Sequence, residues 1–200
     1  HDHAPLGYHY HATVEYPYTV GCYRGEPASP FLATSAEAGA PTKLDVDAEV
    51  AAPFLRGMIA HHVQALELTA LVSERTRNGS VRRIAARMRI AQTEEIRLMR
   101  FWLENEISPG AAEGMPTDMP GMLSADRIQH LRRLSGAEFD RRFLELMMEH
   151  HRGAIVMAQA LLESPGASST RSAIGWFVMH IEAEQAEEVE RMSRMLHGMD

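Results

Sequence analysis

Two pairs of adjacent histidines occur in this chain, and a methionine lies one helical turn before each pair. On an α-helix, residues three or four positions apart lie on the same face. Imidazole nitrogen binds copper, zinc, iron and nickel, whereas thioether sulfur favours Cu(I). The pattern therefore predicts a metal site that uses the side chains of Met58, His61, His62, Met147, His150 and His151.

Adjacent histidines on one helix point in different directions, about 100° apart around the helix axis. Both members of a pair therefore cannot face the centre of a bundle. We expect His62 and His151 to point inward, because each continues the apolar seam of its helix. His61 and His150 are then expected at the helix interfaces.

A second repeated group places an amide and a carboxylate among core methionines, in the stripes Met88-Gln92-Glu95-Met99 and Ile181-Gln185-Glu188-Met192. Burying an unpaired carboxylate is very costly, and an unpaired amide costs a few kcal/mol. We expect histidines of the other helices to satisfy these groups, directly or as imidazoles oriented around a metal. The predicted site thus also includes Gln92, Glu95, Gln185 and Glu188.

Three further thioethers lie in the segment GAAEGMPTDMPGML, whose glycines and prolines predict a loop. Met115, Met119 and Met122 are either soft ligands for Cu(I) or ordinary packing residues. A di-iron bundle requires about four carboxylates, and the repeated inner stripes carry only two, so iron oxidation is disfavoured. His1-Asp2-His3 would form a Cu(II) site if His1 were the natural amino terminus.

Two repeats must position these groups. FLRGMIAHHVQAL (54–66) aligns without gaps to FLELMMEHHRGAI (143–155), and AQTEEIRLM (91–99) aligns to EQAEEVERM (184–192). Each half is therefore predicted to be a helical hairpin that covers its apolar face against its twin. The predicted fold is all-α, a ferritin-like four-helix bundle made of two duplicated hairpins.

The predicted boundaries follow from turn and capping residues. Asp45 begins the first helix, Asn78-Gly79 ends it and Ser80 caps the second; Ser124 opens a short helix, and Ser135 with Glu138 forms a capping box for the next long helix. A fourth long helix is predicted from about Ser169 to Leu196. The resulting units are an extended Tyr/His-rich arm (1–43) and the bundle (44–200), with repeat one at about 45–105, a crossover loop at 106–123 and repeat two at about 124–197.

Composition limits the classes of partner. The chain has 20 Lys and Arg against 27 Asp and Glu, a net charge of −7, which argues against a nucleic-acid partner. No apolar run approaches the length of a membrane span. The lone Cys22 cannot form an internal disulfide.

The paired motifs MIAHH and MMEHHRGAIVMA, the two Q-x-x-E-x-x-x-M stretches and the loop MPGML resemble a bacterial secreted family known as domain of unknown function 305. The resemblance covers about residues 50–197. It implies a ferritin-like bundle, export to the periplasm or cell exterior and, as in some members, copper binding. Its motif positions correspond here to Met58, His61, His62, Gln92, Glu95, Met122, Met147, His150, His151, Gln185 and Glu188.

The sequence thus predicts a secreted or periplasmic protein that binds copper, with zinc or iron as alternative ions, and sequesters or chaperones it. Two other interpretations stay open: a redox-active metal oxidase, and a metal-free bundle in which the histidines only form hydrogen bonds. No enzymatic activity is assigned from the sequence.

Overall fold

The computed structural model describes residues 48–107, 119–164 and 173–199. Within these residues the chain is a bundle of five helices without a strand, which confirms the prediction that the fold is an all-α bundle. The described helices belong to one compact unit, Lys43–Asp200. The predicted extended arm and the predicted helix start at Asp45 lie outside the described residues.

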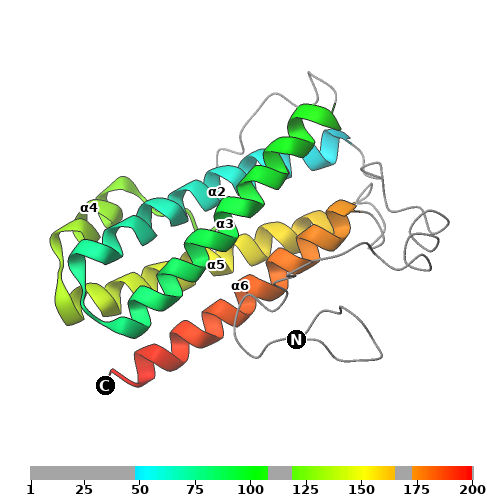
Figure 1. Ribbon diagram of the computed structural model, residues 1–200. Helices are drawn as coiled ribbons and strands as arrows, with labels where there is room; N and C mark the ends of the chain where they lie inside the picture. The colour runs from blue at the N-terminus through cyan, green and yellow to red at the C-terminus, as the bar shows by residue number, and fades with distance from the viewer. Residues whose placement is uncertain (1–47, 108–118, 165–172, 200) are drawn as a thin grey trace, which may run out of the picture. The chain divides into compact units, whose positions relative to one another are not determined.

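Two helical hairpins make up most of the bundle. The first hairpin is α2 (Ala48–Arg75) and α3 (Gly79–Asn105), and the second is α5 (Gly136–Leu162) and α6 (Ala173–His197). The short helix α4 (Ala125–Arg133) lies at one end. α2 and α5 pack against each other in antiparallel directions, while α3 packs on α2 and α6 packs on α5 (Figure 1).

The turn between α2 and α3 differs from the prediction. Asn78 does not end the first helix but caps the second, because its side-chain oxygen accepts hydrogen bonds from the backbone N–H groups of Ser80 (3.0 Å) and Val81 (3.4 Å). α3 therefore begins at Gly79, and the predicted cap Ser80 lies inside the helix. Asparagine is as good an N-cap as serine, and it comes first in the chain.

The starts of α4 and α5 also test the predicted caps. Ser124 accepts a hydrogen bond from the backbone N–H of Arg127 (3.4 Å), as expected for the residue that opens α4. Ser135 stands at the N-cap of α5, but its side chain makes no capping hydrogen bond, so the predicted capping box with Glu138 is wrong. Gly136 has a left-handed backbone (φ 59°), which departs from the geometry that a capping box needs.

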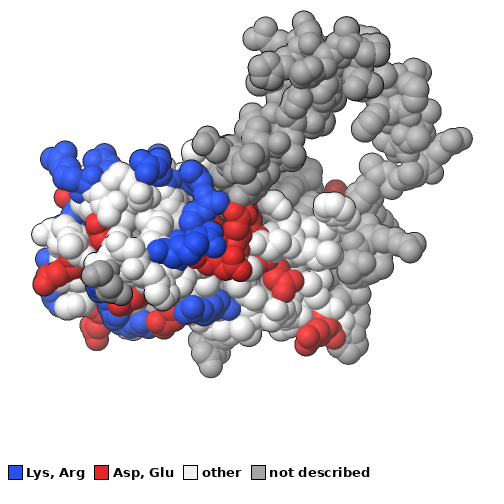
Figure 2. All heavy atoms as spheres, turned by 90° about the horizontal axis from the view of Figure 1, so that it is seen from below, with Lys and Arg blue, Asp and Glu red and all other residues white. Residues whose placement is uncertain are grey.

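Most charged side chains lie on the outside of the bundle, and basic and acidic groups both occur on the face shown in Figure 2. Arg127 pairs with Glu149 (2.5 Å) and Arg132 with Glu67 (2.6 Å), all four being partly exposed. Such pairs contribute at most about 1 kcal/mol each. None of the described helices is both long and apolar enough to cross a membrane.

Candidate metal centre

A layer of polar side chains divides the apolar core. On α2, for example, Met58 belongs to one apolar cluster and Ala65 to the other, and the same change of cluster occurs on α3, α5 and α6. Between its two apolar parts, each long helix carries two polar residues at the positions that the sequence repeat makes equivalent. They are His61 and His62 on α2, Gln92 and Glu95 on α3, His150 and His151 on α5, and Gln185 and Glu188 on α6.

These polar groups are withdrawn from water. The four histidines are at most 1% exposed, both glutamines are 2% exposed and Glu95 is 7% exposed. The side chain of Glu188 is 13% exposed to solvent. His61 and His150 are as buried as the two histidines expected to point inward, since the α2–α5 interface itself lies inside the bundle.

Each hairpin contains one buried hydrogen bond between histidine and glutamate. His62 Nε2 lies 2.8 Å from Glu95 Oε2 in the first hairpin, and His151 Nε2 lies 2.6 Å from Glu188 Oε2 in the second. The two bonds occupy equivalent positions of the sequence repeat. Each histidine therefore satisfies one oxygen of a carboxyl group on the neighbouring helix, as expected from the cost of burying that group unpaired.

The other two histidines meet across the interface between the hairpins. The ring centroids of His61 and His150 are 3.7 Å apart, with the ring planes inclined by 40°. His61 Nε2 lies 3.1 Å from the carbonyl oxygen of Pro120. A carbonyl can only accept, so His61 donates from Nε2 and its Nδ1 carries a lone pair when the ring is neutral.

The end of the crossover loop is fixed beside this histidine pair. Gln64 on α2 donates to the carbonyl of Leu123 (3.0 Å) and accepts from its N–H (2.7 Å). Gly121 has φ 79°, and a Cβ at this position would lie 2.7 Å from the carbonyl oxygen of His150. A Cβ on Gly153 of α5 would overlap the Pro120 carbonyl, so glycine at both positions allows the loop to approach α5.

Burial lowers the pKa of three of the four histidines, His61, His150 and His151. Desolvation, assisted by the charge of His62, lowers the pKa of His61 and of His151 from 6.5 to about 3. Desolvation and the charge of His61 place the pKa of His150 well below its ordinary value. A neutral imidazole can bind a metal, whereas an imidazolium cannot.

The two glutamates have opposite pKa shifts despite their matching geometry. Burial and the negative charge of Glu95 raise the pKa of Glu188 from 4.5 to about 8. Burial also raises the pKa of Glu95, but the hydrogen bond and charge of His62 outweigh it and leave that pKa below 4.5. Two nearby buried carboxyl groups cannot both ionise easily, and Glu95 takes the charge.

Many polar atoms of the layer have no hydrogen-bond partner among the described residues. They include five ring nitrogens: Nδ1 of His61, His62, His150 and His151, and Nε2 of His150. Buried polar atoms in folded proteins are nearly always satisfied by protein, water or an ion. Buried imidazole nitrogens that lack a hydrogen-bond partner fit a transition-metal ion well.

Comparison with known proteins agrees with this architecture. A family model described as domain of unknown function DUF305 matches residues 51–196. The chain belongs to the DUF305 family. A search of curated proteins finds no match.

Two solved structures resemble this DUF305 chain at 28% sequence identity. One is from Streptomyces coelicolor and is provisionally described as a secreted DUF305 protein; its TM-score is 0.67, and the match covers 76% of this chain and 96% of that chain. The other is a DUF305 fragment from Deinococcus radiodurans, with a TM-score of 0.64 and coverage of 76% and 97%.

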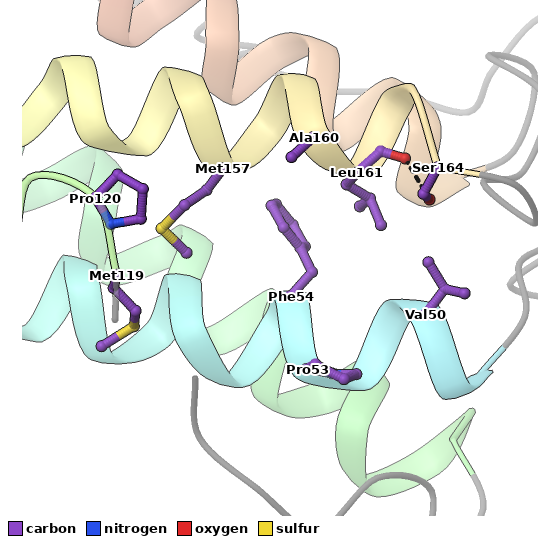
Figure 3. Close-up of a pocket in the computed structure, with 9 residues that line it drawn as sticks. All are labelled: Val50, Pro53, Phe54, Met119, Pro120, Met157, Ala160, Leu161 and Ser164. Atoms are coloured by element: carbon purple, nitrogen blue, oxygen red, sulfur yellow. Dashed lines mark hydrogen bonds between the residues drawn. The ribbon is translucent and has the colours of Figure 1, made fainter. Parts of the chain in front are cut away.

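The structure separates the predicted methionines from one another. Met58 and Met147 are fully buried, each in a different apolar cluster beside the histidine layer. Met119 lines an apolar pocket of about 270 Å³ between α2 and α5, together with Phe54 and Met157 (Figure 3). Met122 is partly buried, and Met115 lies outside the described residues.

One group of ligand-type residues was not predicted from the sequence. His180 and Glu184 on α6 approach Glu95 on α3, and one potential ligand atom from each of the three lies within 4.8 Å of the others. The available signal was the spacing of four residues between His180 and Glu184, which places both on one helical face. That signal had no counterpart in repeat one, so the search for doubled motifs did not detect it.

Proposed function

We propose that this DUF305 protein binds a transition-metal ion in the polar layer, with copper as the favoured ion. The observation that carries the proposal is the set of five buried ring nitrogens that have no hydrogen-bond partner within the part of the chain that the structure describes. Leaving such atoms unsatisfied costs roughly 1–3 kcal/mol each. A bound ion would recover this energy at several of them at once.

The residues suited to hold the ion are His61, His62, His150 and His151. Pro120 and Glu95 occupy Nε2 of His61 and His62, which leaves Nδ1 of each ring as the donor atom. Partners of this kind orient metal-binding imidazoles and increase their basicity. The low pKa values of His61 and His151 support the proposal, because few protons would compete with the ion at neutral pH.

Imidazole donors suit copper, zinc, iron and nickel, so the choice among these ions rests on other features. Met58 and Met147 adjoin the layer and could add thioether donors, which favour Cu(I). We therefore propose copper, with zinc or iron as alternatives. Gln92 and Gln185 are buried in the same layer, and in this proposal they would accept hydrogen bonds or complete the ligand set.

We further propose that the protein is ferritin-like in architecture and acts outside the cytoplasm by sequestering or chaperoning the ion. The provisional description of the Streptomyces coelicolor relative as secreted supports the location. The doubled hairpins and the central polar layer support the ferritin-like class. Among the described residues, the repeated positions of the layer carry two carboxyl groups, Glu95 and Glu188, which favours metal storage or transfer over an iron oxidase.

The test is the double substitution His62→Gln and His151→Gln, with Cu(I), Cu(II) and Zn(II) binding measured by calorimetry and metal analysis. Glutamine keeps an N–H that can donate to each glutamate but binds metals weakly. We expect the tightest site to be lost while the helical circular dichroism signal stays. The matched control is His130→Gln, at an exposed histidine of α4, which should bind as the wild type does.

Two results would decide for the other interpretations. Absence of binding by the wild type would leave the histidines as a hydrogen-bonded network that fixes helix register. Oxygen consumption on addition of Cu(I) or Fe(II), abolished by the double substitution, would indicate a metal oxidase instead.

A further inference from the structure

A group of three ligand-type side chains connects the surface with the polar layer. His180 and Glu184 lie one turn apart on α6, with Nε2 and Oε2 separated by 3.5 Å. Glu95 reaches them from α3, and one ligand atom of each residue lies within 4.8 Å of the other two. These distances are short enough for one ion to contact all three after small side-chain adjustments.

Exposure decreases from His180 toward Glu95. The side chain of His180 is 63% exposed, that of Glu184 is 11% exposed and that of Glu95 is 8% exposed. The group is therefore open to solvent at one side and closed at the other. A cation could meet His180 first and then the two carboxyl groups.

Glu95 also belongs to the buried layer, and it supplies an independent reason to expect a ligand. Its Oε2 is bonded to His62, whereas its Oε1 is buried and has no hydrogen-bond partner among the described residues. A carboxylate more than nine-tenths buried is costly with half of its acceptors unused. A cation beside His180 and Glu184 would satisfy this oxygen.

The sequence repeat shows that this group is not a by-product of duplication. The alignment that equates Glu95 with Glu188 also equates Glu184 with Ala91 and His180 with Arg87. The second hairpin therefore carries an imidazole and a carboxylate where the first carries a cation and a methyl group. This combination of side chains favours a metal ion beside Glu95 and disfavours one at the equivalent position beside Glu188.

We propose that His180, Glu184 and Glu95 form an outer site for a divalent transition-metal ion, from which the ion passes to the buried histidines. One imidazole and two carboxylates suit Zn(II) or Cu(II), and they offer no soft donor for Cu(I). Glu95 is the shared residue, since it contacts His62 on its inner side. The loading role rests on the proposed function, whereas binding at the outer site does not.

Binding at the outer site is tested by titrating Zn(II) into the His62→Gln/His151→Gln variant, in which Glu95 keeps a hydrogen-bond donor. We expect a weaker site to remain and to disappear when His180→Ala and Glu184→Gln are added. His180→Ala alone changes an exposed side chain, so it should weaken this site without affecting folding. Binding unaffected by either change would overturn the proposal.

The loading role is tested by stopped-flow uptake of Zn(II) in the otherwise unchanged chain. We expect His180→Ala/Glu184→Gln to slow uptake at least about tenfold, because a cluster of acidic groups raises the local concentration of cations and so the rate of association. The buried site should still fill at equilibrium. The control is Arg87→Ala, the equivalent position in repeat one, which should not slow uptake. Equal rates in the wild type and the double variant would overturn loading.

Failure of the proposed function would look different. If His62→Gln/His151→Gln left all Zn(II) binding unchanged and His180→Ala/Glu184→Gln removed it, the outer site would stand as the protein's metal site. The buried histidines would then be structural.

Discussion

His61 gives the sharpest test of how burial governs this centre. It is 1% exposed, its ring lies against that of His150, and burial is the main reason why its pKa falls to about 3. In the unfolded chain the pKa returns to about 6.5. The unfolded state therefore binds a proton at pH values where the folded state does not.

The sign and size of the effect follow from this difference. A depressed pKa contributes stability that is present above pH 6.5 and is lost as the pH falls toward 3. At about pH 5 the unfolded chain gains roughly 2 kcal/mol from protonation of this one residue, at 1.36 kcal/mol per pH unit. The variant His61→Gln lacks this term and keeps an N–H that can donate to Pro120.

The assay is urea unfolding of the metal-free protein, followed by circular dichroism at about pH 7 and pH 5. We expect the free energy of unfolding of the wild type to fall by about 2 kcal/mol more than that of His61→Gln over this range. Taking the difference between the proteins cancels the contributions of Glu188 and the other histidines. His130→Gln, at an exposed histidine, should follow the wild type, and parallel curves for wild type and His61→Gln would refute the argument.

Three other predictions address the carboxyl pair and the loop. Because burial and the charge of Glu95 raise the pKa of Glu188 from 4.5 to about 8, its stabilising effect is present below about pH 4.5 and is lost as the pH rises through 8; Glu188→Gln should remove this loss in urea unfolding between about pH 5 and 8, and an unchanged profile would contradict it. Gly153→Ala should lower stability by about 3 kcal/mol or more in thermal unfolding, whereas Gly198→Ala, where a Cβ meets only ordinary contacts, should change it little. Replacing all three crossover-loop methionines with leucine should weaken Cu(I) binding and leave Zn(II) binding unchanged if the sulfurs are ligands; a loss of thermal stability with unchanged Cu(I) binding would identify them as packing residues.

The repeated sequence was sufficient to predict the helices and the polar character of their inner face. Helical periodicity is local, so the spacing from Met58 to His62 and from Gln92 to Glu95 places these groups on definite stripes. The cost of burying a carboxylate then required a partner, and histidine was the predicted one. The pairs His62–Glu95 and His151–Glu188 have this arrangement.

Helix ends were less predictable. Asn78, Ser80 and Ser135 are all competent caps by residue type, and the choice among them depends on the path of the connecting turn. The conformation of Gly136 likewise depends on how α4 and α5 pack, which no local pattern contains.

The sequence by itself determined which residues each helix presents to the core, because that depends only on spacing along one helix. The tertiary structure alone decided which of them meet across helices: His61 with His150, His61 with the carbonyl of Pro120, and Glu95 with His180. It also decided that Glu95 is ionised while Glu188 holds a proton near neutral pH, because a pKa depends on burial and on charges from other elements. Two copies of one motif thus acquired different chemistry from their surroundings.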